Sequence, residues 1–344
     1  MSDAPKKSHY IVGPLYDWAF FLLPPLVSLW LGMMISGTGF SDGTFELFGL
    51  ETTAAGLCIG TIIHAHLVAV VFRSHLNREI FELHPWRFIA VPVFLWIAIV
   101  SSTWIAITAT VVATFWDVWH SGAQTFGFGR IYDRNAGVPP DAGRRLDLWL
   151  NQLLYLGPIL GGAALAEHIH SFDAYEDVGA AFFTAIPAQV EGHQRYITYG
   201  LLVAGSLFVL YYVLAHVQLW KRGHRSSPLK IFLTATTGLC SIYTWGFNTW
   251  GEAFFIMNLF HAVQYLALVW AVEHKRIAAV FRVSRVPGGR RIAAGLFLLS
   301  VFLYGAFAET LDPDIDTLWA LTVVVSLMHF WYDGFVWSIR KRQI

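Results

Sequence analysis

The sequence predicts an all-α, polytopic integral-membrane protein with about ten transmembrane helices. Of its 344 residues, 56% are hydrophobic and 13% are charged, whereas soluble domains carry about 25% charged residues. The apolar residues form repeated runs long enough to cross a hydrocarbon core about 30 Å thick. The basic residues are almost confined to every second connection between these runs. Together these observations exclude a soluble fold.

The first run follows Lys6 and Lys7 and continues through Pro24 and Pro25 without a small-residue cleavage site. We therefore expect a retained first span and no removed signal peptide. Windows of about 20 apolar residues identify the other spans. The ten predicted spans are 15–36, 53–72, 87–101, 104–128, 147–166, 197–219, 229–247, 253–273, 292–309 and 317–338. The third and fourth form one apolar block broken only at residues 101–104, and its length suits a tight hairpin.

The distribution of charge tests this count independently, because cytoplasmic connections are enriched in Lys and Arg. With ten spans and the N-terminus inside, 22 of the 23 basic residues fall on the cytoplasmic side and only Arg195 falls outside. Acidic residues such as Asp42, Glu51 and Asp173 lie on or near the outer side. One span more or fewer would mix the two sets. We therefore expect a single helical domain over residues 1–344, with both termini cytoplasmic, in a bacterial inner membrane.

Composition excludes some kinds of site and partner. Cys58 and Cys240 both lie in apolar runs, where a thiol behaves as a small hydrophobe, so neither a disulfide framework nor a CxxC metal motif is expected. The formal net charge of zero gives no indication of nucleic acid as a partner. The longest outer connection, residues 167–196, carries an apolar stretch at 180–186 among acidic residues and fits either an interfacial helix or lid, or a plain connector.

Histidines inside the predicted spans lie at a common depth. They are His64, His66, His120, His261 and His329, in the second, fourth, eighth and tenth spans, which all run from outside to inside. The first basic residue at the inner end follows His64 by 9, His120 by 10, His329 by 11 and His261 by 14 residues. At 1.5 Å per residue, the imidazoles lie about 14–21 Å from the inner edge, near the middle of the bilayer.

Other polar side chains share a helix face with these histidines, at spacings of three or four residues. They are Asp117 and Gln124 around His120, Asn258 and Gln264 around His261, and Asp333 after His329. Ionisable groups at this depth are costly and functional by default. A metal ion would offset the cost, because neutral imidazole is a common ligand, and carboxylates or amides orient such ligands.

The donor types favour a particular metal. Nitrogen ligands with some oxygen and no thiolate favour iron, with zinc, copper or manganese as alternatives. A metal centre is the first interpretation of the pattern, and a proton or ion pathway in a transporter is the second. A bis-histidine haem is the third, although it needs one opposed pair and leaves the other histidines unexplained. Broken helices would favour the transporter, and only Gly157-Pro158 followed by Gly161-Gly162 suggests one.

Four short segments around these histidines resemble the Brp/Blh family of integral-membrane oxygenases, which convert β-carotene to retinal. The segments are His64-Ala65-His66, His120-Ser-Gly122, His261-Ala-Val-Gln-Tyr265 with Val269-Trp270, and His329-Phe-Trp-Tyr-Asp333. Tyr265 stands where the family has a second histidine, and Ala65-His66 stands where it has glycine. The resemblance implies non-haem iron held by membrane-embedded histidines, with His66, Asp117 or Asp333 completing the coordination.

The predicted function is a metal-dependent oxygenase or oxidase that takes dioxygen and a lipophilic, carotenoid- or terpenoid-like substrate. The histidines would leave one coordination position open for dioxygen. Asp117 and Asp333 are expected to orient ligands or to join them, and Tyr265 to donate a hydrogen bond, a proton or an electron. The amides of Gln124, Asn258 and Gln264 are expected to support the site from outside the ligand set.

Overall fold

The computed structural model describes residues 8–248, 250–311 and 316–337. Several charges used to predict the topology lie outside these residues, namely those of Lys6, Lys7, Asp312, Asp314, Arg340, Lys341 and Arg342. The described chain is almost entirely helical, and its only strands form one two-stranded sheet. The all-α class predicted from the sequence is therefore confirmed.

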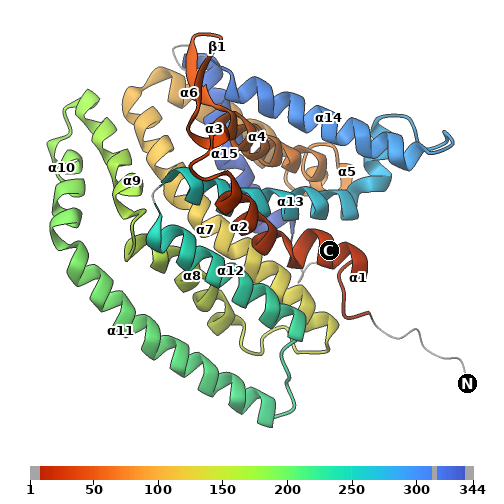
Figure 1. Cartoon of the computed structure of the whole chain (residues 1–344). Coiled ribbons are helices and arrows are strands. Elements are labelled where there is room, and N and C mark those ends of the chain that lie inside the picture. The colour runs from red at the N-terminus through yellow and green to blue at the C-terminus, as the bar shows by residue number, and fades with distance from the viewer. Residues whose placement is uncertain (1–7, 249, 312–315, 338–344) are drawn as a thin grey trace, which may run out of the picture. The chain divides into compact units, whose positions relative to one another are not determined.

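The long helices follow the predicted spans (Figure 1). They are α1 (Pro14–Asp17) with the π-helical η1 (Trp18–Leu22) and α2 (Pro24–Ile35), α4 (Ala54–Arg73), α6 (Pro85–Ser101), α7 (Thr103–Asn135), α8 (Arg144–Leu160), α11 (Ile186–Lys221), α12 (Pro228–Phe247), α13 (Trp250–Val280), α14 (Gly289–Glu309) and α15 (Asp316–Val336). The short elements are α3 (Gly39–Asp42), β1 (Thr44–Leu47), β2 (Leu50–Thr53), α5 (Arg78–Leu83), α9 (Leu165–Ile169), η2 (His170–Val178) and α10 (Ala181–Thr184).

Five stretches of the described chain are long and apolar enough to cross a membrane by themselves. These are α4, Ala181–Lys221, Ala253–Val280, α14 and α15. The number rises to seven if each of two bent pairs crosses once, one pair bent by 45° after Leu22 and the other by 95° after Leu160. The chain is thus a membrane protein by the length and composition of its helices. Helices α7 and α12 are not among these stretches, and α12 carries buried threonines at 234, 236, 237 and 244.

Local sequence explains where several helices begin and end. The Thr53 hydroxyl caps α4 by accepting a hydrogen bond from the Gly56 amide at 2.9 Å. Pro85 starts α6, where its missing N–H costs nothing. Ser102 is extended, with φ −152° and ψ 114°, and separates α6 from α7. The predicted break at residues 101–104 is therefore confirmed.

Contacts within the chain divide it into two compact units. Unit 1 comprises Met1–Met33, Asp117–Asp173 and Ala181–His261, and unit 2 comprises Met34–Trp116, Ala174–Ala180 and Ala262–Ile344. Four of the boundaries fall inside helices, after Met33 in α2, after Trp116 in α7, after Asp173 in η2 and after His261 in α13. Each unit therefore contains part of a helix that continues into the other.

A buried ion network joins the helices of unit 1. The Asp147 carboxylate on α8 accepts hydrogen bonds from Arg130 of α7 at 2.6 Å and from Lys230 of α12 at 2.7 Å. Asp133 pairs with the same two cations at 3.0 and 2.8 Å. All four side chains are nearly inaccessible to solvent. Two positive and two negative charges balance within this network, as buried charges require.

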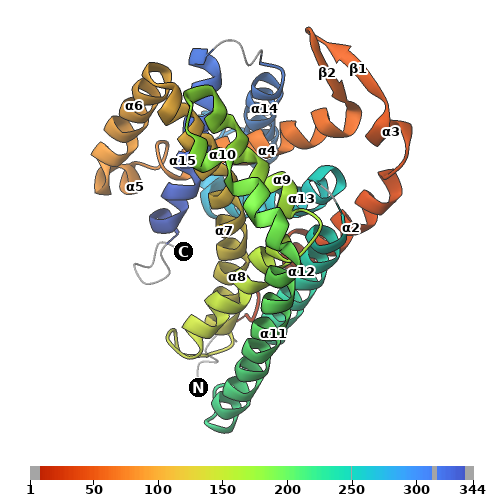
Figure 2. The same ribbon diagram turned by 90° about the vertical axis from the view of Figure 1, so that its left-hand side faces the viewer.

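Unit 2 is built around α4, which packs against α14 and α15. A Cβ atom at Gly305 of α14 would collide with the carbonyl oxygen of Thr61, so glycine permits the close approach of these two helices. The β1–β2 hairpin leads into the N-terminal end of α4 (Figure 2). Buried apolar residues from α4, α6, α14, α15 and the second half of α13 form one core cluster.

The connection 167–196 is helical, since it contains η2, α10 and the start of α11. In unit 1, the His170 imidazole lies between two carboxylates, 2.6 Å from Asp173 and 3.0 Å from Glu191 of α11. These carboxylates, Asp173 foremost, raise the pKa of His170 above its ordinary value. The protonated ring donates to both and so ties η2 to α11.

The contacts of His170 with Asp173 and Glu191, called here the His170 clasp, predict that hydrogen-exchange protection of the connection depends on pH. A raised folded-state pKa stabilises the folded arrangement fully below the ordinary pKa of about 6.5, and the stabilisation is lost as the pH rises through the raised value. Hydrogen-exchange protection of residues 170–173 should therefore fall above about pH 6.5. His170→Gln should remove this pH dependence. Equal pH dependence in both proteins would contradict the clasp.

Candidate metal centre

His66 and His329 lie side by side in the core of unit 2. They project from α4 and α15, and both side chains are fully buried. Their ring centroids are 5.0 Å apart, with the rings at 84°. The Nδ1 atom of His329 lies 3.0 Å from the carbonyl oxygen of Leu67. Because a carbonyl oxygen can only accept, Nδ1 carries the proton, and Nε2 keeps the lone pair that a metal ligand needs.

Tyr265 and Asp333 complete this part of the site. The Tyr265 ring packs on His329, with centroids 4.6 Å apart, and its hydroxyl donates to Asp333 Oδ1 at 2.8 Å. The Trp337 indole donates to the same oxygen at 3.0 Å. The other oxygen, Oδ2, lies 3.8 Å from His329 Nε2. Two donors thus fix the carboxylate so that its second oxygen faces the imidazole.

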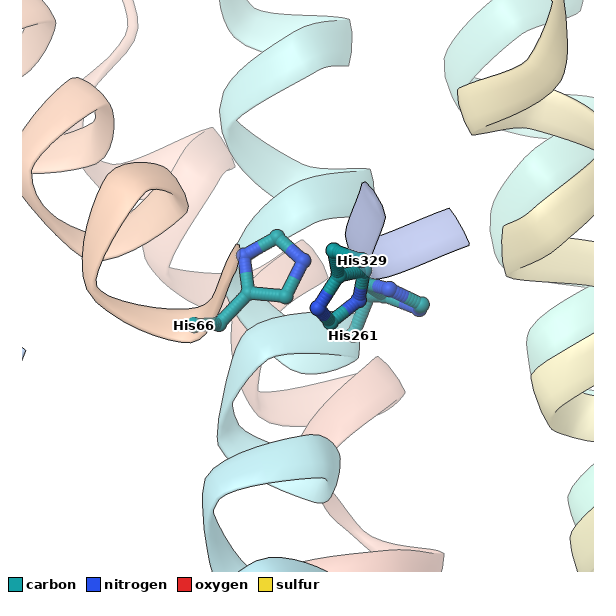
Figure 3. Close-up of side chains that lie close together, drawn as sticks. All are labelled: His66, His261 and His329. Carbon is teal, nitrogen blue, oxygen red and sulfur yellow. The ribbon is translucent and has the colours of Figure 1, made fainter. Parts of the chain in front are cut away.

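His261 lies on the same face of α13 as Tyr265, one turn earlier, and the unbroken helix joins it to unit 2. Ligand nitrogens of His66, His261 and His329 lie within 4.8 Å of one another, and Figure 3 shows the three rings converging. Two nitrogens bound to one ion at about 2.1 Å are at most about 4.2 Å apart. Small side-chain rotations would bring these three within that limit, so the residues fit a single metal ion.

His120 forms a close pair with His261 within unit 1. Their ring centroids are 5.1 Å apart at 81°, and both side chains are buried. The Gln124 amide donates to the carbonyl oxygen of His261 at 3.1 Å, so it holds the backbone of α13 in place. His120 is therefore placed beside one of the three converging histidines.

The remaining predicted residues have different surroundings. The Asn258 amide donates to the carbonyl oxygen of Phe254 on its own helix at 3.0 Å. Gln264 is fully buried on α13, and Asp117 is half-buried on α7. His64 lies apart from the three converging histidines, with Nε2 3.8 Å from Glu309 Oε2 on α14. Two residues along a helix correspond to about 200°, so His64 and His66 point to opposite sides of α4.

A buried ion pair that was not predicted from the sequence lies next to the site, toward the helix ends that carry the basic residues. Arg73 pairs with Glu273, and its guanidinium donates to the carbonyl oxygen of Val336 at 3.2 Å. The same group lies 4.8 Å from the centroid of the Trp337 ring. Asn77 donates to Glu273 at 2.9 Å. The pair therefore joins α4, α13 and α15 and positions the indole that holds Asp333.

One signal in the sequence could have revealed this pair. Glu273 is an acidic residue at the basic end of a predicted span, where the other charges are mostly positive. Its side chain is 1% exposed. An acidic group in that position indicates a buried basic partner.

Comparison with protein-family models, curated proteins and solved structures finds no match to this chain. The relationship to the Brp/Blh family remains a prediction from the four short segments.

Proposed function

We propose that this chain is a membrane-embedded, metal-dependent oxygenase or oxidase that acts on a lipophilic substrate with dioxygen. The convergence of His66, His261 and His329, each at most 1% exposed, carries the proposal. Ionisable groups inside a membrane are costly, and a cation bound by the three rings would offset the cost. Three nitrogen donors beside a carboxylate and no thiolate suit non-haem iron, with zinc, copper or manganese as alternatives.

The residues around the histidines have distinct tasks in this proposal. His66, His261 and His329 would hold the ion, which when bound supplies redox and Lewis-acid chemistry. The carbonyl oxygen of Leu67 orients His329, and Asp333 is in place to orient the ion's ligands or to join them. Tyr265 keeps its proton directed at Asp333 and shields one side of His329 from water.

The geometry favours a bare ion over haem. His66 and His329 meet edge to face with centroids 5.0 Å apart. This contact leaves no room for a porphyrin between the two rings. The depth predicted for the histidines makes a lipid-soluble substrate the simplest to deliver, and the resemblance to the Brp/Blh family makes carotenoids and terpenoids the first compounds to assay.

Elemental analysis and an absorption spectrum of detergent-purified protein test the proposal. We expect about one equivalent of iron per chain and no haem absorption bands. A Soret band would replace the proposal with a haem-binding electron-transfer protein. Protein purified without any bound metal, and unable to take up iron, would favour a proton- or ion-coupled transporter instead.

We also propose ten spans with both termini cytoplasmic, in a bacterial inner membrane. Each predicted span coincides with one long helix or one bent pair, and 22 of the 23 basic residues segregate to one side. A cysteine at Arg195 should react with a membrane-impermeant maleimide in intact cells, and one at Arg225 should react only after permeabilisation. The reverse pattern would show that the orientation is opposite to the one proposed. Equal labelling of both cysteines would contradict the proposed topology.

A further inference from the structure

An apolar pocket of about 450 Å³ lies in unit 2 between α6, α7 and α15. Its floor includes Ala109 and Met328, each 7% exposed. Its rim includes Trp104, Ile105 and Val112, which are 40–43% exposed. These exposed apolar residues belong to a helix that we place in the membrane, so the rim faces lipid.

The pocket follows α7 over several turns. The residues of α7 that line it recur every three to four positions from Trp104 to Trp116, and so form one stripe along the helix. Twelve residues at 1.5 Å each give a length of about 18 Å. An apolar stripe of this length suits one extended hydrocarbon chain lying along α7.

The two ends of the pocket differ. One end lies at the start of α7, where Ser101, Ser102 and Thr103 form the turn from α6 at the predicted membrane face. The other end is lined by Met328 and Trp331, which lie on either side of His329 along α15. A length of about 18 Å covers roughly half of a hydrocarbon core about 30 Å thick. The pocket thus runs from the membrane face to the depth of the candidate metal centre.

The lining contains little that could bind a polar group. Thr108 supplies its one hydroxyl, which already donates to the carbonyl oxygen of Trp104 at 2.7 Å and lies 3.0 Å from the Tyr175 hydroxyl. A polar group on the occupant would therefore remain outside the mouth, beside the hydroxyls of residues 101–103. The open rim allows a second chain of the same molecule to stay in the bilayer.

We propose that this pocket binds one acyl chain of a membrane phospholipid, with the headgroup at the membrane face near residues 101–103 and the chain end level with His329. The length, the apolar lining and the open rim of the pocket, which together suit a two-chain lipid, carry the inference. Binding stands on the pocket alone. The further step, that the held chain is the substrate, rests on the proposed metal-dependent function.

Photolabelling of the full-length protein tests the site. The probes are two phosphatidylcholines, with a diazirine near the headgroup end or near the terminal methyl of one chain. We expect the first probe to label peptides that contain residues 104–108, and the second to label Trp116 or residues 327–331. Ordinary surrounding lipid would label all lipid-facing helices alike, so labelling of the exposed Leu202 and Leu207 of α11 as strong as that of the pocket residues would overturn the proposal.

Variants of α7 provide the matched controls. Val112→Trp should fill the pocket and reduce labelling on the order of tenfold, whereas Thr110→Trp, at an exposed position outside the lining, should leave it unchanged. Ile105→Trp is the second variant, for use if Val112→Trp does not fold. Unchanged labelling in a folded pocket variant would overturn the site.

Competition identifies the occupant. Excess unlabelled phosphatidylcholine should suppress labelling, and excess squalane, a hydrocarbon without a headgroup, should not. Suppression by squalane alone would assign the pocket to a headgroup-free molecule and overturn the proposal. Labelling requires no metal, so His329→Ala should lose iron and keep the labelling pattern. The lipid site and the metal centre can therefore fail separately.

Discussion

Replacing His329 with alanine is expected to abolish iron binding in the purified protein, and His66→Ala and His261→Ala should have the same effect. Each variant removes one of three buried nitrogen donors that lie within 4.8 Å of one another. Loss of a ligand should exceed the roughly 10–100-fold loss of affinity typical of an orienting partner. Iron content per chain, measured after reconstitution under anaerobic conditions, is the readout.

Two other histidines serve as matched controls. His64→Ala should keep the wild-type iron content, because His64 faces Glu309 and lies outside the converging group. His193→Ala, at an exposed position whose ring bonds the backbone of its own helix, should also keep it. Full iron content in all three site variants would rule out this centre. A loss in His64→Ala as large as in His329→Ala would show that the ligand set is wrong.

Glu273→Gln is expected to destabilise the protein by about 3–5 kcal/mol, because it leaves the buried guanidinium of Arg73 without its counter-charge. Both side chains are at most 5% exposed. The loss should appear as a lower midpoint of thermal unfolding in detergent. Displacement of Trp337, over which Arg73 lies, should also loosen Asp333 and weaken iron binding.

An exposed ion pair provides the comparison. Arg78 and Glu82 pair at 2.6 Å but are 88% and 60% exposed, so Glu82→Gln should leave the midpoint of thermal unfolding almost unchanged. The double variant Arg73→Met with Glu273→Leu should recover part of the loss, since it removes both buried charges. A Glu273→Gln protein as stable as the Glu82→Gln protein would show that the Arg73–Glu273 pair does not hold α4, α13 and α15 together.

Much of the fold could be predicted because bilayer thickness imposes a length on each apolar run. The break between α6 and α7 at Ser102 was visible as a polar interruption in an apolar block. The residues at which some helices begin could not be predicted from the sequence. Helix α11 begins at Ile186, eleven residues before its predicted span, because a helix can continue beyond the membrane without an apolar sequence.

The candidate site shows the same division. Helical periodicity placed His261 and Tyr265 on one face of α13, and His329 and Asp333 on one face of α15. It could not show that the Tyr265 hydroxyl bonds Asp333, since that contact depends on how α13 and α15 pack. Nor could it join Arg73 to Glu273, which are 200 residues apart in the chain.

The sequence by itself determined that this is a helical membrane protein with histidines inside its spans. Those properties follow from composition and local spacing, which the bilayer converts directly into helices. Only the tertiary structure decided which histidines meet. His64 and His66 are equally central in α4, and the packing of α15 against one side of that helix places His66, and not His64, beside His329. Spacing along one helix fixes a direction, but only the neighbouring helix fixes what lies in that direction.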